Sequence, residues 1–223
     1  MPSATGRCCA SRSAAGCTSW TWPRRTRKGS GPSSTPVARA DAGTPPVLKL
    51  ATPRLELIAA TAAVARAAVS DRDALARLLS ARVPASWPHE LLADNLEAFA
   101  RRIEADPALE GWLPWYWVTR EDRTLIGNGG FGAVPAEDGS GKIGYALIAE
   151  HEGRGFATEA VAAILEWAFS HPALSRVVAD TYPELSRSIR VLQKNGFRYA
   201  GPGRGERVIR YELTRGAWLA AVS

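Results

Sequence analysis

The residues with the clearest chemical meaning form a glycine turn, Glu152-Gly153-Arg154-Gly155, between a predicted strand and a predicted helix. Glycines let the backbone turn so that successive N–H groups point into one concavity, and the helix N-terminus adds partial positive charge. Arg154 offers a charge-assisted contact and Thr158 a hydroxyl donor to a phosphate. A Gly-x-Gly turn alone is more often plain packing. Its place between strand and helix favours a pyrophosphate site.

The elements that position this turn follow from the spacing of the apolar residues. Alternating apolar residues predict strands, and spacings of three and four predict helices. The predicted strands are residues 54–58, 115–119, 124–134, 142–148, 176–181, a short segment near Tyr199, and 208–213. The predicted helices follow Asp71, run from His89 to about Ala105, run from Ala157 to Ser170, and run from Pro183 to just before Gly196. The order β-α-α-β-β-β-α-β-α-β-β predicts an α+β domain.

The positive charge of the chain is concentrated at its N-terminal end. The 223 residues carry a formal net charge of +6, and residues 1–40 contain seven basic residues and no acidic one. Cys8, Cys9 and Cys17 also lie there, an odd number that gives no disulfide framework. Because residues 1–46 are rich in Ser, Thr, Gly and Pro, we expect a disordered basic extension there. Residues 47–223 are expected to form one folded domain.

Three interpretations of residues 1–46 stay open: an organelle transit peptide, a tail that binds polyanions, or sequence upstream of the true start. The remaining chain has 21 basic and 22 acidic residues, so a nucleic-acid partner is not expected. No apolar run approaches the roughly 18 residues of a membrane helix. We expect a soluble, cytoplasmic protein with no membrane partner, either a monomer or a homodimer.

Residues 47–217 resemble the GNAT superfamily of acyl-CoA N-acyltransferases in motif and in element order. The phosphate-loop pattern of that superfamily is Gln or Arg, two residues, Gly, one residue, and Gly or Ala. Gly155 and Ala157 match it, while Glu152 replaces the usual Gln or Arg. Two further segments are typical of the superfamily: Ile143-Gly144-Tyr145 and Thr158-Glu159-Ala160. The resemblance implies a mixed, mostly antiparallel central sheet flanked by helices.

The same resemblance implies acetyl-CoA as co-substrate and no metal. The coenzyme pyrophosphate would lie on the glycine turn, and a backbone N–H at the end of the preceding strand would stabilise the thioester oxyanion. The residues implied in coenzyme binding are Leu147, Ile148, Ala149, Gly153, Arg154, Gly155, Phe156, Ala157, Thr158 and Ser188.

A second segment, residues 183–197, resembles the coenzyme-flanking helix of GNAT proteins related to ribosomal-protein N-terminal acetyltransferases. Leu185 stands where an Asn is common, and Leu192 stands where other branches have a tyrosine acid. A tyrosine general acid is therefore not expected. The resemblance places the Ser188 hydroxyl beside the coenzyme sulfur, where it would stabilise the departing thiolate. A serine on a helix face with no catalytic part is an equally open interpretation.

The reaction implied is attack by a neutral amine on the thioester carbonyl. A lysine-like amine has a pKa near ~10.4, so about one molecule in a thousand is ready at neutral pH, and a base or water chain must take the proton. Glu206 is the first candidate for this base, because the ribosomal acetyltransferases have an acid in this region. A solvated charge is the plainer interpretation of Glu206. Glu150 and His151 are the alternatives.

The acceptor pocket, by the same resemblance, lies between the first two predicted strands. The predicted substrate-binding residues are Trp87, Tyr116 and Tyr182. Trp115 and Trp117 alternate, so they are at least as suited to the sheet core. Residues 86–111 contain six acidic and two basic residues. This charge suits a cationic acceptor, or else belongs to an ordinary solvent-facing helix.

Three functions remain in competition. The first is acetylation of a primary amine on a small cationic molecule, for which an aminoglycoside or a polyamine fits the charge pattern. The second is acetylation of a protein N-terminus. The third is a non-catalytic sensor of acyl-CoA, suggested by the missing tyrosine and by the open question of the base.

Overall fold

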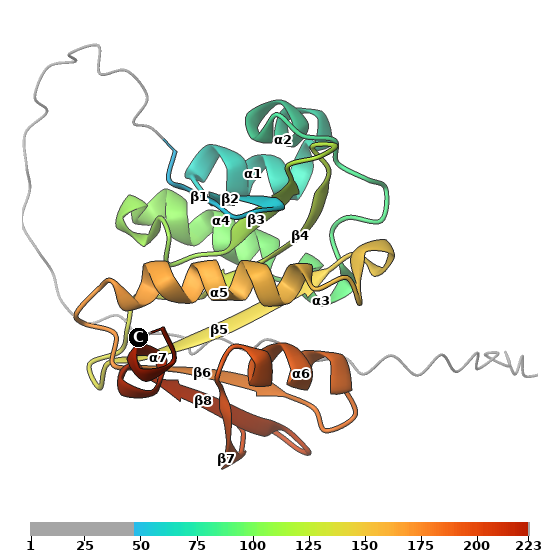
Figure 1. Ribbon diagram of the computed structural model, residues 1–223. Helices are drawn as coiled ribbons and strands as arrows, with labels where there is room; N and C mark the ends of the chain where they lie inside the picture. Colours follow the sequence, from blue (N-terminus) through green and yellow to red (C-terminus); the bar gives the residue numbers. More distant parts are fainter. Residues whose placement is uncertain (1–46, 223) are drawn as a thin grey trace, which may run out of the picture.

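The computed structural model describes residues 47–222, whose alternating apolar residues form one eight-stranded sheet (Figure 1). The strand order across the sheet is β1-β2-β3-β4-β5-β6-β8-β7. The strands are β1 (Lys49–Ala51), β2 (Leu55–Ala59), β3 (Trp115–Thr119), β4 (Leu125–Phe131), β5 (Ser140–Leu147), β6 (Arg176–Thr181), β7 (Arg198–Pro202) and β8 (Ile209–Thr214). Among these eight strands of residues 47–222, only β5 and β6 pair in parallel. The predicted mixed, mostly antiparallel sheet is confirmed.

Helices cover both faces of the sheet. The cluster on one face joins α1, α2 and α4 to Ile58 and Tyr116, and the cluster on the other joins α5 to Leu57 and Trp117. The helices are α1 (Ala62–Ser70), α2 (Arg72–Leu79), α3 (Glu90–Ala93), α4 (Leu96–Ala105), α5 (Phe156–Phe169), α6 (Ser186–Lys194) and α7 (Arg215–Val222). No helix of residues 47–222 is long and apolar enough to cross a membrane. The predictions for residues 1–46, including the extension and the cysteines, lie outside the described residues.

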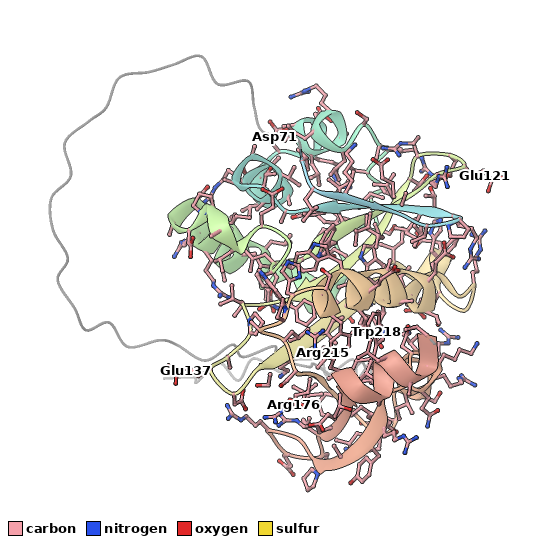
Figure 2. All side chains as sticks on the ribbon, turned by 60° about the vertical axis from the view of Figure 1, so that its left-hand side comes forward. Asp71, Glu121, Glu137, Arg176, Arg215 and Trp218 are labelled. Carbon is pink, nitrogen blue, oxygen red and sulfur yellow. The ribbon has the colours of Figure 1, made fainter. Side chains whose placement is uncertain are left out.

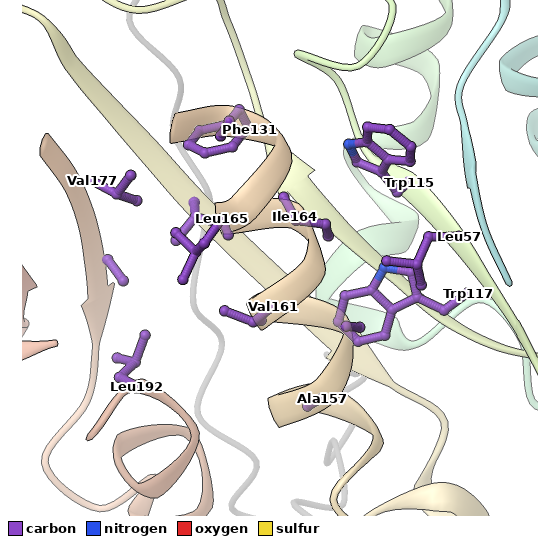
Figure 3. Packing of buried hydrophobic residues seen from close by; sticks show 14 of the residues in the cluster. Leu57, Trp115, Trp117, Phe131, Ala157, Val161, Ile164, Leu165, Val177 and Leu192 are labelled. Atoms are coloured by element: carbon purple, nitrogen blue, oxygen red, sulfur yellow. The ribbon is translucent and has the colours of Figure 1, made fainter. Parts of the chain in front are cut away.

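Helix α5 is the central element of one face, and its sequence explains why. Residues at spacings of three and four, among them Val161, Ile164 and Leu165, are all buried. Figure 3 shows these side chains lying between Trp115 on one side of the helix and Val177 on the other. Each fully buried aliphatic side chain contributes about 1.5–3 kcal/mol. This packing holds the helix N-terminus at a defined place beside the sheet.

Strands β5 and β6 are paired over only part of their length. Their parallel ladder runs from the Ser140–Arg176 pair to the Lys142–Val178 pair. Figure 1 shows the two strands diverging beyond that point, towards their carboxyl ends. Both strands continue past the ladder, to Leu147 and Thr181. The backbone at the end of β5 is thereby separated from β6.

The C-terminal half of the fold is closed by α7, which the sequence analysis did not predict. The guanidinium of Arg215 donates hydrogen bonds to the carbonyls of His171 (2.6 Å) and Leu174 (2.5 Å), and Trp218 stacks on Phe169 with ring centroids 5.2 Å apart. Figure 2 shows Arg215 and Trp218 in this half, far from Asp71 at the start of α2. Helix α7 therefore fastens β8 to the end of α5.

Two elements at the beginning of the domain were also missed. Strand β1 pairs with β2, and α1 is capped by Thr61, whose Oγ1 accepts a hydrogen bond from the Val64 N–H (3.3 Å). The segment is so rich in alanine that its large apolar residues show no clear period. Alanine is the best helix former, so the helix forms without a clear apolar period. Its buried residues are Val64, Ala65, Ala67 and Ala68.

Two predicted helices have different bounds in the structure. The single helix expected from His89 to Ala105 is wrong, because a turn at Asp94 and Asn95 divides it into α3 and α4. Asp and Asn form local hydrogen bonds that favour turns over helix interiors. Helix α6 begins at Ser186 rather than Pro183, because the Leu185 N–H bonds the Tyr182 carbonyl in a preceding turn (3.1 Å).

Candidate active site

The glycine turn joins β5 to α5, as the sequence predicted. A short 3-10 turn (Ala149–His151) follows β5, and α5 begins at Phe156. Gly153 (φ +72°) and Gly155 (φ +83°) lie in the left-handed region, which costs other residues about 1–2 kcal/mol. Gly155 precedes the first helical residue and no side chain caps it. The N–H groups of the first helical turn lack intrahelical partners and are open to an anion.

The loop between β1 and β2 holds the glycine turn in place. The Arg54 guanidinium donates to the Arg154 carbonyl (2.9 Å) and lies 4.5 Å from the centroid of the Phe156 ring. Its Nε also donates to Glu159 in the first turn of α5 (2.6 Å). The Thr52 hydroxyl donates to the same carboxylate (2.6 Å). Two segments about 100 residues apart in sequence are thereby joined at the turn.

The carboxylate of Glu159 is held ionised by these contacts. Burial alone would raise its pKa, but hydrogen bonds from Thr52 and from Arg54 outweigh burial, and the pKa lies below its ordinary value. Charge-assisted bonds of this kind are roughly twice as strong as neutral ones. Glu159 therefore acts as the link between the β1–β2 loop and the helix that follows the turn.

The turn opens into a cleft of about 850 Å³ where β5 and β6 diverge. One wall consists of the end of β5, the turn and the start of α5, and the other consists of the end of β6 and α6. The predicted coenzyme-binding residues that line the cleft are Leu147, Gly153, Gly155, Phe156, Ala157, Thr158 and Ser188. Arg154 and Ala149 are exposed outside its lining, and Ile148 is buried in the core on the opposite face.

Backbone N–H groups at the end of β5 point in different directions. The Ile148 N–H donates to the Ile126 carbonyl of β4 (2.9 Å) and is therefore engaged within the sheet. Successive residues of a strand direct their N–H groups to opposite edges. The Leu147 N–H consequently points away from β4, towards the side on which the cleft lies. The Leu147 N–H therefore has the direction required of the oxyanion donor expected at the end of this strand, and the Ile148 N–H does not.

Comparison with known families agrees with this geometry. A family model described as an acetyltransferase (GNAT) domain matches residues 59–198, more than half of the chain. The chain belongs to the GNAT acetyltransferase family. The family resemblance drawn from the glycine turn and the element order is therefore confirmed.

Curated relatives of this GNAT protein are N-acetyltransferases of uncharacterised function. N-acetyltransferase p20 of Bacillus licheniformis is 36% identical over 97 residues, which cover 43% of this chain and 54% of the relative. N-acetyltransferase YjdG of Bacillus subtilis is 27% identical over 111 residues, which cover 50% of this chain and 66% of the relative. The chain thus spans about half to two thirds of the length of these relatives.

Solved structures share the GNAT fold. The ribosomal-protein-S5-alanine acetyltransferase of Vibrio fischeri has a TM-score of 0.54 at 18% identity, covering 77% of this chain and 98% of its own. The aminoglycoside acetyltransferase AAC(6')-Ib in complex with coenzyme A has a TM-score of 0.52 at 21% identity, covering 76% and 99%. At these identities the likeness concerns the fold, and two different acceptor classes occur on it.

Ser188 lies across the GNAT cleft from β5. The Tyr145 hydroxyl is 3.3 Å from the Ser188 carbonyl oxygen and 3.4 Å from its Oγ, and the Tyr145 ring stacks on Trp117. Burial raises the pKa of Tyr145 to about 12, although its contact with Ser188 lowers it slightly, so the phenol remains protonated at neutral pH. Sequence reasoning named Tyr145 only as part of a family motif. Its alternation with Ile143 and Leu147 was the signal that all three side chains project from the same face of the sheet, the one covered by α5.

Glu152, the departure from the family pattern, forms an ion pair across the cleft. Its carboxylate contacts the Arg187 guanidinium at the start of α6, and both residues line the cleft. The Arg187 side chain is 70% exposed, so the pair contributes at most about 1 kcal/mol. Arg190 and Lys194 line the same wall. The α6 side of the cleft is therefore basic and suits an anionic coenzyme.

Of the other predicted site residues, His151 lines the cleft and the rest do not. Trp87 (3% exposed) and Tyr116 (2% exposed) pack together in the core, and burial raises the pKa of Tyr116. Tyr182 is half-buried in the turn before α6. Glu206 is exposed in the connection between β7 and β8. Of the alternative bases, Glu150 is exposed, whereas His151 lines the cleft. Burial and the nearby Arg154 lower the pKa of His151.

Sequence reasoning missed an acid that does line the cleft, Asp180 at the end of β6. Burial alone would raise its pKa, but bonds from Arg210 (2.8 Å and 3.0 Å) and Lys142 (3.0 Å) outweigh burial and lower it. The strand period places Asp180 on the face opposite Ala179 and Thr181, which was the available signal. With two cations on it, Asp180 is an ionised structural link rather than a proton acceptor.

Two of the acidic side chains of residues 86–111 are neutralised by ion pairs in the structure. Arg66 of the unpredicted helix α1 pairs with Glu97 (3.0 Å) and Glu104 (2.6 Å), and Arg101 also contacts Glu97 (2.7 Å). Glu90 remains on the cleft lining. Within residues 47–222, no group of three His, Cys, Asp or Glu residues is arranged to hold a metal ion.

Proposed function

We propose that this chain transfers an acetyl group from acetyl-CoA to a primary amine of a small cationic molecule. The observation that carries the proposal is the glycine turn, which presents the N-terminus of α5 to a cleft between two diverging strands. Because the chain spans only part of its curated relatives, the activity stands as a proposal for the whole protein.

The residues of the cleft fit coenzyme A. A pyrophosphate suits the first-turn N–H groups of α5, with Thr158 as a hydroxyl donor and Arg154 as a nearby cation. Arg190 and Lys194 supply positive charge on the facing wall. Glycine at 155 keeps a side chain away from the place where a phosphate approaches the backbone. When bound, the coenzyme supplies the activated acetyl thioester.

The proposed reaction is the transfer of the acetyl group from the thioester sulfur to the amine nitrogen. The amine nitrogen forms a bond to the thioester carbonyl carbon, the C–S bond breaks, and the thiolate leaves. The Leu147 N–H stabilises the carbonyl oxygen as it gains negative charge. The Ser188 hydroxyl donates a hydrogen bond to the sulfur. The amine loses its first proton to solvent before attack and its second afterwards, while the thiolate of pKa near ~8.5 takes up a proton from solvent.

The small cationic acceptor is favoured by carboxylates on the cleft lining. Glu90 lies there, as do Glu184, which is paired with Arg207 (3.4 Å), and Asp180, whose charge is balanced by Arg210 and Lys142, so Glu90 carries most of this argument. An aminoglycoside or a polyamine carries several ammonium groups and gains from such a field. The fold is also that of the aminoglycoside acetyltransferase AAC(6')-Ib, at an identity that supports the fold only. Glu206 remains a candidate base, with open solvent as the other route for the proton.

Acetylation of a protein N-terminus is the second candidate. The segment 183–197 favours it, because that motif resembles the ribosomal-protein acetyltransferases, and the Vibrio fischeri enzyme of that kind shares the fold. The pairing of Arg66 with Glu97 and Glu104 also weakens the argument from negative charge.

Release of free CoA thiol across a panel of amines separates these functions. We expect turnover of acetyl-CoA with aminoglycosides or polyamines and none with peptides. The reverse pattern would establish the second candidate. Binding of acetyl-CoA without thiol release from any amine would leave only the sensor function.

A further inference from the structure

Polar atoms without partners lie on the sheet face opposite α5. Among residues 47–222, Asn128 of β4 is 1% exposed, and neither its Oδ1 nor its Nδ2 has a hydrogen-bond partner. The indole N–H of Trp87 is likewise buried and unpartnered within this part of the chain. Burying such groups unbonded is costly, and folded proteins keep few of them. A water molecule or a ligand that reaches this carboxamide would satisfy it.

The sheet register places Asn128 beside the cleft. Its ladder partner on β5 is Ala146, which lines the cleft, and its partner on β3 is Tyr116. Directly opposed residues project from the same face, with Cβ atoms about 4.5–5.5 Å apart. Trp87 packs on Tyr116 with ring centroids 6.0 Å apart. These residues form one row that runs through the core and ends at the cleft.

Glycines on both sides hold Asn128 close to β5. A Cβ at Gly127 would lie 2.4 Å from the Ala146 carbonyl oxygen, and one at Gly129 would lie 2.4 Å from Cβ of Tyr145. Strands β4 and β5 therefore approach closely here, and only Asn128 projects a polar group. The carboxamide is fixed against the strand whose end carries the Leu147 N–H.

We propose that Asn128 binds the acceptor substrate, with Oδ1 accepting a hydrogen bond from the reacting amine and Nδ2 donating to an oxygen close to it. This inference rests on the proposed function and narrows its substrate class. A carboxamide presents one acceptor and one donor side by side. It is matched by an amine with an adjacent oxygen, as in an amino sugar or at a peptide N-terminus. A plain polyamine has no such oxygen.

The surroundings of Asn128 favour the reactive form of the amine. Asn128 and Trp87 carry no charge, and burial raises the pKa of the Tyr116 phenol, which stays neutral. Desolvation penalises an ammonium ion more than a free amine. Entry requires the Trp87 ring to turn away from Tyr116, and the unpartnered indole N–H then becomes a second donor. The Asn128 carboxamide and the Trp87 indole N–H, which have no partner among the described residues, would both be satisfied by such a ligand.

The test combines acceptor binding with stability, using the full chain saturated with CoA and three probes: kanamycin, spermidine and a tetrapeptide with a free N-terminus. Calorimetry measures binding without requiring turnover. For Asn128→Leu we expect an unchanged or higher Tm, because an unpartnered group is removed. We also expect about tenfold weaker binding of kanamycin or of the peptide. Spermidine binding and acetyl-CoA affinity should not change. Asn128→Ser serves as a second variant if the leucine does not fit.

Thr124→Val is the matched control, because Thr124 is also buried but its hydroxyl bonds Asp122. We expect it to lower Tm and leave acceptor binding unchanged. The inference is overturned if both Asn128 variants lower Tm and bind kanamycin and peptide normally, which would make the carboxamide structural. It is also overturned if the wild-type protein binds neither probe, whether or not thiol release is seen. Loss of kanamycin binding alone identifies an amino sugar, and loss of peptide binding alone identifies an N-terminus.

Discussion

The coenzyme end of the cleft and the proposed acceptor end, which lies in the core behind Ala146 of the cleft lining, differ in how fully their polar side chains are bonded. At the coenzyme end, Arg54, Thr52 and Glu159 form a connected set of short hydrogen bonds around the glycine turn. At the acceptor end, Asn128 and Trp87 are buried without partners among the described residues. At the first end these side chains are bonded to one another and only the N–H groups of the first turn of α5 and His151 Nδ1 are left for a ligand among the described residues, whereas at the second end the side chain that we propose as the binding group is itself unbonded.

This difference suits a fold that binds the same acyl donor, acetyl-CoA, with different amine acceptors. In the proposed function, donor recognition is assigned to backbone N–H groups and to glycine conformations, neither of which requires a Gln or Arg side chain at position 152. In the further inference, acceptor recognition is assigned to side chains, Asn128 first among them. We expect changes at the coenzyme end to alter the KM for acetyl-CoA without altering the KM for the acceptor, because the bonds of Arg54, Thr52 and Glu159 do not extend to Asn128.

The largest effect is expected from Gly155→Ala. An alanine at φ +83° is strained by about 1–2 kcal/mol, and its methyl group stands where a phosphate approaches the turn. We expect the KM for acetyl-CoA to rise about tenfold, measured by thiol release, with the acceptor KM unchanged. Gly201→Ala in β7 (φ +103°, with open space around the new Cβ) is the control. Equal KM increases in both variants would mean that strain, rather than phosphate access, is responsible.

Glu159→Gln should loosen the coenzyme end. It weakens charge-assisted bonds to Arg54 and Thr52, and we expect a loss of about 1–2 kcal/mol in the free energy of unfolding and a KM for acetyl-CoA raised severalfold. The folded pKa of Glu159 is depressed, so its stabilisation is present above the ordinary carboxyl pKa and is lost as pH falls below about 4. Wild type should therefore lose more stability than the variant on acidification, measured by urea unfolding.

Glu166→Gln is the matched control for this experiment. Glu166 lies on the same helix but is exposed, so its replacement should change neither stability nor KM. A stability curve of Glu159→Gln that parallels wild type down to acid pH would contradict the proposed role of the Arg54 contact.

Ser188→Ala tests the place where the proposed coenzyme sulfur and the acceptor amine would meet. Loss of one hydrogen bond to the departing sulfur should lower kcat about fivefold and leave both KM values unchanged. Ser186→Ala removes a hydroxyl from the same helix and the same cleft wall, and it should not change kcat. If both variants behave like wild type, the interpretation of Ser188 as a plain helix-face serine is the correct one.

The smallest effect is expected from Glu206→Gln. Glu206 is exposed and outside the cleft lining, so we expect turnover to stay within about twofold of wild type across pH 6–9. A drop of tenfold or more, with a changed pH profile, would show instead that Glu206 is the base and that the acceptor end extends to the β7–β8 connection.

Local patterns predicted the parts of the fold that depend on local physics. The period of Val161, Ile164 and Leu165 was sufficient for α5, and the glycine turn was sufficient to place the junction between β5 and α5. Helix α1 was not predictable in this way, because alanines give no periodic signal, and the division of the 89–105 segment depended on a turn at Asn95. The packing of Trp87 against Tyr116 could not be read from the sequence either, since an aromatic side chain suits a pocket and a core equally.

The order of residues by itself determined the family, the sheet and the coenzyme turn, because glycine conformation and apolar period act over a few neighbouring residues. Only the tertiary structure decided which groups meet. It joined Arg54 to Glu159 over 105 residues, paired Arg66 with two acids of the supposed acceptor region, and placed Asn128 unbonded beside Ala146. Such contacts depend on strand register and helix packing, which bring distant segments together and leave no pattern in either segment alone.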